Sequence, residues 1–145
     1  MSLVVSAAGL LRFLSLARLT SQARRQAAAR KTAAAPRGQL GRGTREHQRT
    51  PALVPGLPGV LRRARVVMAA AGHFHSAAST SAGELLVWGA KGNGQLGLGD
   101  REDRTAPATL GRERFGGWPV LMVACGAYHT VTVTEVGRVF TFGCG

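Results

Sequence analysis

The residues of this sequence that could bind a ligand begin with a glycine-rich stretch. Residues 92–97, with the sequence GNGQLG, satisfy the G-x-G-x-x-G pattern with which many proteins hold a nucleotide phosphate. That use of the pattern requires a helix directly after the glycines, because the phosphate binds at the helix N-terminus. Here residues 98–107 contain Gly99, a charged cluster and Pro107, and they predict a loop. We therefore interpret the glycines as a turn and expect no bound cofactor.

A metal site or a catalytic set is the second kind of chemistry to consider. His73, His75 and Cys125 are ligand types that suit zinc. However, residues 122–130 align with residues 68–76 and have Ala127 at the position of His73. No fourth ligand is in view. No Ser–His–Asp set is recognisable. Cys125 and Cys144 do not form a C-x-x-C pair, and we interpret them as buried thiols in a reducing compartment. The sequence therefore predicts neither a catalytic nor a metal site.

The third candidate is a charged segment, residues 100–104. It consists of Asp100, Arg101, Glu102, Asp103 and Arg104. A loop of mixed charge is most often solvated surface, and it is also the kind of loop with which a repeat protein contacts a protein partner. We treat these five residues as candidate partner-binding residues.

The net charge of +12 is concentrated at the N-terminal end of the 145-residue chain. Residues 1–37 carry seven basic side chains and no acidic one, and residues 38–65 carry six arginines against Glu46. Residues 66–145 hold six basic and six acidic side chains. A fold that binds nucleic acid is expected to carry its basic patch on the folded part. The sequence therefore argues against nucleic acid as a partner of this neutral region.

Residues 1–37 form a basic, low-complexity segment that we separate from the rest of the chain. The segment is rich in Ala, Arg, Leu and Ser and lacks acidic residues, as organelle transit peptides do; a helical or disordered tail is the alternative. Arg12 and Arg18 interrupt its apolar run well before the ~20 residues of a membrane span, so we expect none. A tail fits a protein of the cytoplasm or nucleus, whereas a transit peptide fits a mitochondrion or another organelle.

Residues 38–145 contain a repeat. Residues 38–52 and 94–108 are identical at nine of fifteen positions, and residues 68–76 align with residues 122–130. We place the two repeats at about 38–93 and 94–145. Self-similarity with a period of this size indicates a propeller or a solenoid, in which each unit packs against its neighbours. The repeat-motif positions are Gly38, Gln39, Leu40, Gly41, Gly72, His75, Trp88, Gly89, Gly94, Gln95, Leu96, Gly97, Gly126, His129, Gly137, Phe142 and Gly143.

Each repeat contains short strands joined by glycine turns. Residues 120–124 are a continuous apolar run, which is consistent with a buried strand. Residues 129–142 have the pattern of a hairpin of two alternating strands around Gly137, and residues 76–88 repeat this pattern less cleanly. Several short strands with Gly turns in each unit are typical of a propeller blade, so we predict an all-β fold.

Two strings of residues carry a resemblance to a known family. One is W-G-x4-G-Q-L-G-x-G-D at residues 88–100, and the other is V-A-C-G-x2-H-T-x3-T-E-x-G-x-V-F-x-F-G at residues 123–143. They resemble the regulator-of-chromosome-condensation repeat, and the resemblance covers residues 38–145. It implies a partial β-propeller, roughly two blades of a seven-bladed family. The sequence departs from the family at Lys91, where a second glycine is usual, and at residues 32–33, where the first copy lacks Trp-Gly.

Proteins that contain this repeat serve several functions. Our first hypothesis is a non-enzymatic module for protein–protein interaction. The alternative is a guanine-nucleotide exchange factor for a Ran-type small GTPase, and the second alternative is the partner-binding part of a ubiquitin ligase. Because propellers close with about four to eight blades, we expect a chain that is truncated at its C-terminus and is a fragment of a longer repeat protein.

Overall fold

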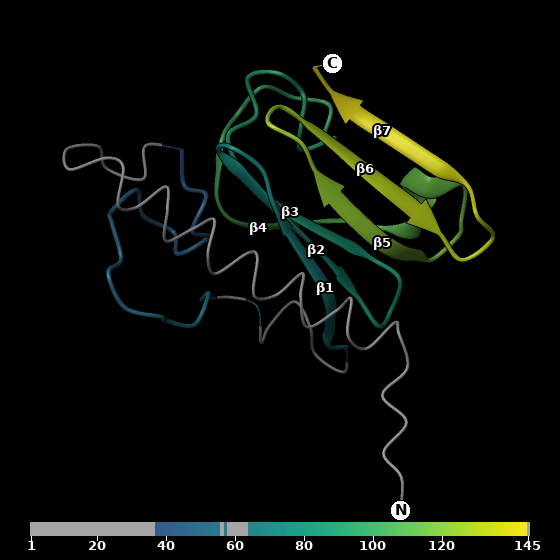
Figure 1. The fold of residues 1–145 in the computed structure, drawn as a ribbon, viewed down its shortest axis with the longest axis horizontal. Helices are drawn as coiled ribbons and strands as arrows, with labels where there is room; N and C mark the ends of the chain where they lie inside the picture. Colours follow the sequence, from purple (N-terminus) through teal and green to yellow (C-terminus); the bar gives the residue numbers. More distant parts are fainter. Residues whose placement is uncertain (1–36, 56, 58–63, 145) are drawn as a thin grey trace, which may run out of the picture. The chain divides into compact units, whose positions relative to one another are not determined.

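The strands of the computed structural model form two antiparallel sheets (Figure 1), and the structure describes residues 37–55, 57 and 64–144. The first sheet contains, in spatial order, β1 (Val66–Ala71), β2 (His75–Thr80), β3 (Leu85–Gly89) and β4 (Arg104–Leu110). The second contains β5 (Val120–Cys125), β6 (His129–Thr134) and β7 (Val139–Gly143). A single 3-10 turn, η1 (Arg112–Phe115), lies between β4 and β5. The all-β prediction is confirmed, whereas residues 1–36 of the N-terminal segment predicted for residues 1–37 lie outside the described residues.

The two sheets repeat each other down to their irregularities. In the first sheet the β1–β2 pairing slips between Val66 and Met68, and in the second the β5–β6 pairing slips between Val120 and Met122. These positions correspond in the sequence alignment of the two repeats. Each slip adds a residue to the first strand of its sheet, β1 or β5, and increases the local twist of that strand. The sequence repeat is therefore also a structural repeat.

The alternating strand β6 buries its threonines more deeply than its valines. Thr130, Thr132 and Thr134 are buried, while Val131 and Val133 share the opposite face and are only half-buried. The predicted alternation is confirmed. Each buried hydroxyl donates to a backbone carbonyl, so the polar face can be buried at little cost.

The larger apolar core lies between the sheets, where β5 packs against β1 and β2. The ring of Phe115 from η1 and the ring of Phe140 from β7 form a T-shaped pair, with the ring centroids 5.5 Å apart. A smaller cluster on the other face of the first sheet joins Ala78, Leu86 and Trp88 to Leu57. The buried members of the larger core are Ala77, Leu85, Val87, Leu96, Leu110, Phe115, Val120 and Val123.

The second repeat supplies the last strand of the first sheet. β4 pairs with β3 through Leu85 opposite Leu110 and Gly89 opposite Arg104. The prediction that residues 98–107 are loop is therefore wrong for residues 104–107, which begin β4. Pro107 is tolerated because β4 is the edge strand of its sheet, where a missing N–H need not break a ladder. The strand ties the two sequence repeats together.

The two G-Q-L-G stretches make the same turn against the two sheets. The Gly41 amide donates to the Gly38 carbonyl at 2.9 Å, and the Gly97 amide donates to the Gly94 carbonyl at 3.0 Å. All four glycines have φ between 65° and 76°, a left-handed conformation that favours glycine. The interpretation of the glycines as a turn agrees with this geometry.

Candidate functional site

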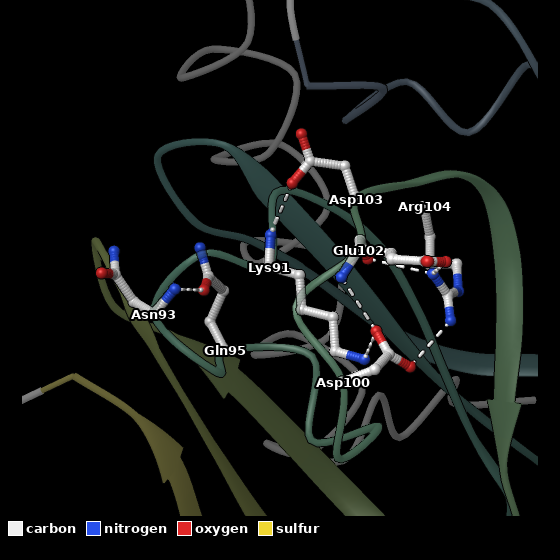
Figure 2. Close-up of polar contacts among 7 residues, drawn as sticks. All are labelled: Lys91, Asn93, Gln95, Asp100, Glu102, Asp103 and Arg104. Atoms are coloured by element: carbon white, nitrogen blue, oxygen red, sulfur yellow. Dashed lines mark hydrogen bonds and ion pairs between the residues drawn. The ribbon is translucent and has the colours of Figure 1, made fainter.

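The candidate site is the connection between β3 and β4, which contains the second G-Q-L-G turn and leads into the charged segment, residues 100–104. Figure 2 shows the polar side chains of this connection gathered around Lys91. The Gln95 side chain forms a local hydrogen bond within the connection, in which its Oε1 accepts from the Asn93 amide at 2.9 Å. The chain continues from the glycines as loop and then as strand β4, so no helix N-terminus lies there to bind a phosphate.

Lys91 lies at the start of this connection with its side chain fully buried. Its ammonium forms an ion pair with Asp100 and has no hydrogen-bond partner among the other described residues. Its backbone amide donates to Oδ1 of Asp103 at 3.0 Å. One lysine therefore holds two carboxylates of the charged segment, one through its side chain and one through its backbone.

Asp100 receives three donors. Its Oδ1 binds the Lys91 ammonium and accepts from the Glu102 amide at 2.9 Å, while its Oδ2 accepts from Arg104 at 2.9 Å. The hydrogen bond from Lys91, followed by that from the Glu102 amide, holds the pKa of the Asp100 carboxyl below its usual value. The carboxylate is therefore ionised over the physiological pH range, which keeps all three contacts in place.

Asp103 and Arg104 are also turned toward the protein. Oδ2 of Asp103 binds the Arg37 guanidinium at 3.3 Å, and the Asp103 side chain is only 12% exposed. Arg104 donates to the Glu102 carbonyl at 3.0 Å as well as to Asp100. Arg37, which the sequence assigns to the N-terminal segment, is thus a contact of the charged segment.

Arg101 and Glu102 are the two side chains of the charged segment that face solvent. The Glu102 side chain is 84% exposed, and its carboxylate makes one long contact of 3.5 Å with Arg104. Arg101 is exposed and has no ion pair or hydrogen bond with the described residues. Of the five candidate residues, three therefore build the segment and two remain available for contact.

His75 and Cys125 belong to the junction between the sheets. Nε2 of His75 lies 2.9 Å from Oγ1 of Thr130, and the Thr130 hydroxyl donates to the Gln95 carbonyl at 2.8 Å. Burial raises the pKa of the Cys125 thiol to about 12. Cys144 is exposed, so the interpretation of both cysteines as buried thiols is wrong for this residue. No group of three or more metal-binding side chains occurs among residues 37–55, 57 and 64–144. In the same residues no helix has the length and apolar character that a membrane span requires.

The sequence did not identify Lys91 as part of the site. It marked this residue only as a departure from the family pattern, and its ammonium is the group around which the segment is arranged. The signal that could have identified Lys91 is a basic residue where the family usually has glycine, shortly before a segment that contains acidic residues.

Antiparallel sheets of consecutive strands that repeat along the chain, each with the same Gly turn, are the architecture of a β-propeller repeat protein. The sequence model of the Regulator of chromosome condensation (RCC1) repeat matches residues 36–79 and 82–133, and the chain belongs to this family. The resemblance noted in the sequence is thereby confirmed.

Known relatives of the chain include proteins of different functions. It is 42% identical over 106 residues to the Ultraviolet-B receptor UVR8 of Arabidopsis thaliana, covering 73% of this chain and 23% of the receptor. It is 39% identical over 109 residues to the human "Probable E3 ubiquitin-protein ligase HERC4", covering 74% of this chain and 10% of the ligase. The chain thus spans less than a quarter of the length of these relatives.

The fold also matches solved structures of the family. The structure of yeast RCC1 (Prp20) bound to Kap60 is 25% identical and superimposes with a TM-score of 0.62, covering 76% of this chain and 26% of that chain. The chain therefore has the fold of part of an RCC1-type propeller, as predicted.

Proposed function

We propose that this chain is a non-enzymatic module for protein–protein interaction and that the charged segment, residues 100–104, contacts the partner. The observation that carries the proposal is the exposure of Arg101 and Glu102 on a segment whose other charges are bonded inward. A pre-ordered loop loses little conformational entropy on binding, and charges at its tip select a partner with complementary charges.

The charge distribution favours a protein over a nucleic acid as the partner of the repeat region. Residues 66–145 are electrically neutral in sum, and the charges of the segment are of both signs. Phosphate backbones are recognised by an excess of basic side chains. The yeast relative named above was solved with a protein, Kap60, bound to it, which agrees with a protein partner for this fold.

A photo-crosslinking experiment tests the proposal with the full chain. A photoreactive amino acid replaces Val136 in a control variant and Gly99 in the other variant, because Gly99 directly precedes the charged segment, an added side chain there meets open space, and all five charges are kept. Val136 is 47% exposed in the turn between β6 and β7, at the opposite end of the strands from the β3–β4 connection. We expect discrete crosslinked proteins from cell extract at position 99 and none of the same species at position 136. No crosslink at position 99, or the same products at both positions, contradicts the proposal.

The exchange-factor alternative has a direct assay. The full chain is mixed with a Ran-type GTPase that holds a fluorescent nucleotide, and nucleotide release is followed over time. An interaction module without exchange activity leaves the release rate unchanged. Acceleration of release would replace the non-enzymatic proposal with the exchange-factor function. The ubiquitin-ligase alternative places the same segment in partner selection, and the crosslinked products would then include ubiquitination substrates.

A further inference from the structure

Lys91 is the one formally charged side chain among the described residues that is fully buried. Removing an ammonium from water is unfavourable, and a buried lysine persists in its charged form only when an opposite charge accompanies it. Asp100 supplies that charge. A charged ammonium therefore occupies the start of the β3–β4 connection, although the turn in that connection does not require a charge.

The residues around the first G-Q-L-G turn lack both members of the ion pair. The residues that align with Lys91 and Asp100 are Ala35 and Thr44, and His47 aligns with Asp103. The G-Q-L-G turn is retained in both repeats and forms in both. The buried ammonium and its carboxylates thus accompany only the second G-Q-L-G turn and are not needed to make the turn.

The ion pair between Lys91 and Asp100 is linked to further polar contacts, which Figure 2 shows. Lys91 holds Asp100, and Asp100 in turn accepts from the Glu102 amide and from the Arg104 guanidinium. These contacts fix the backbone on both sides of Arg101. With residues 100, 102 and 104 tied together, the exposed side chains of Arg101 and Glu102 carry opposite charges at consecutive positions of an ordered backbone.

We infer that Lys91 is a positioning residue that orders the charged segment for binding, and that the partner is a protein surface with an acidic and a basic side chain next to each other. The inference rests on the proposed function and adds the determinant of the loop conformation and the chemistry of the partner. A fixed pair of opposite charges discriminates by arrangement rather than by net charge, because a partner with reversed order meets like charges.

The first experiment tests the positioning role without any partner. Lys91 is replaced by Met, which keeps the length and removes the charge, and by Gly, the usual family residue. Hydrogen exchange at the Glu102 amide and tryptic cleavage after Arg101 are measured, and both are expected to accelerate at least about tenfold in either variant. Exchange in the middle of β6 and the melting temperature of the Lys91→Met variant should stay close to those of the unmodified chain.

The control is Arg114→Met, which removes an exposed cation in η1 at the other end of the strands. It is expected to change neither the exchange of the Glu102 amide nor cleavage after Arg101. A purely structural role of Lys91 would lower the melting temperature and raise exchange throughout the sheets. Unchanged exchange and cleavage in both Lys91 variants would overturn the positioning role.

The second experiment tests the link to binding, with the photoreactive amino acid at position 99 as the probe. We expect the Lys91→Met change in the labelled chain to lower the crosslink yield at least about fivefold. Unlabelled chain competes for the crosslink, and we expect this competition to be abolished when the unlabelled chain carries the exchanged charges, Arg101→Glu with Glu102→Arg. If the segment loosens but the yield is unchanged, the inference fails and the proposed function stands. If the chain that retains Lys91 gives no crosslink at position 99, the proposed function fails, and the partner chemistry fails with it.

Discussion

Nε2 of His75 in β2 lies 2.9 Å from Oγ1 of Thr130 in β6, and this contact joins the two sheets. The Thr130 hydroxyl has one proton, which it donates to the Gln95 carbonyl, so it accepts from Nε2–H of the imidazole. The neutral ring therefore carries its proton on Nε2, and its buried Nδ1 has no hydrogen-bond partner among the described residues. Charging His75 would place a proton on that nitrogen in a dry environment.

The first prediction concerns pH. Burial, followed by the proximity of His129, lowers the pKa of His75 from 6.5 to about 4. Between these values the unfolded chain binds a proton at His75 that the folded chain does not, so stability decreases as the pH falls from 6.5 to 4. At about 1.4 kcal/mol for each pKa unit, the complete loss approaches about 3 kcal/mol. Urea unfolding at several pH values measures it.

The control for the pH prediction is His75→Gln, which cannot titrate. The difference in unfolding free energy between the two proteins should vary with pH across this window and become constant below it. Parallel pH dependences of the original protein and the variant would contradict the assignment of a buried neutral His75.

The second prediction concerns the hydroxyl of Thr130. Thr130→Val keeps the shape of the side chain but leaves Nε2–H of His75 and the Gln95 carbonyl without their partner. Because each unsatisfied buried group costs about 1–3 kcal/mol, we expect the unfolding free energy to fall by about 3 kcal/mol. Thr130→Ser keeps the hydroxyl and should lose about 1 kcal/mol, the contribution of one buried methyl group. Equal losses for Val and Ser would show that the hydroxyl is not the stabilising group.

The third prediction compares two glycines with positive φ. Gly89 has φ 103°, and an added Cβ would lie 2.4 Å from the Phe74 carbonyl oxygen and 2.7 Å from Cα of His75. Gly99 has φ 82°, and its added Cβ would meet nothing within 4 Å. Gly99→Ala should therefore cost only the backbone strain of about 1–2 kcal/mol.

Gly89→Ala adds a collision with backbone atoms that cannot rotate away. We expect it to cost at least about 2 kcal/mol more than Gly99→Ala, a size typical of overpacking. Thermal unfolding of the two variants side by side measures the difference. Similar melting temperatures would mean that β2 and β3 can separate without loss, which the pairing of His75 with Gly89 argues against.

The fold could be predicted from the sequence wherever the signal is local. The hairpin of β6 and β7 has alternating residues around Gly137, and both strands formed as expected. Strand β4 has no such alternation and contains Pro107. It is a strand because β3, which is buried along its whole length, has a free edge at which to pair. That requirement arises from tertiary structure and leaves no trace in residues 104–110.

The charged segment could be located from composition, but the direction of its side chains could not. Lys91 and Asp100 are separated by the G-Q-L-G turn, and only the reversal of the chain at that turn brings their charges together. Arg37 reaches Asp103 from a distance of 66 residues because the first turn packs against the start of β4, where an added Cβ at Gly38 would lie 2.6 Å from Cα of Thr105. Contacts across such separations need the fold.

The fourth prediction concerns the way each turn is held against its sheet. In the first repeat, Nε1 of Trp88 and the Ser76 hydroxyl both donate to the Gln39 carbonyl, each at 2.9 Å. In the second repeat Phe142 occupies the position equivalent to Trp88, and the Thr130 hydroxyl is the one side-chain donor to the Gln95 carbonyl among the described residues. One donor is thus sufficient to hold the turn, and the indole N–H is a second bond to an acceptor that is already satisfied.

Trp88→Phe should therefore lower the unfolding free energy by about 1 kcal/mol, the ordinary net value of a hydrogen bond, plus a smaller loss from reduced ring area in the cluster with Leu86. Ser76→Ala alone should cost a similar amount, because the indole remains as donor. The double variant leaves the Gln39 carbonyl without either donor, so its loss should exceed the sum of the two single losses. Urea unfolding of the four proteins as a double-mutant cycle measures this coupling, and strict additivity would contradict the shared acceptor.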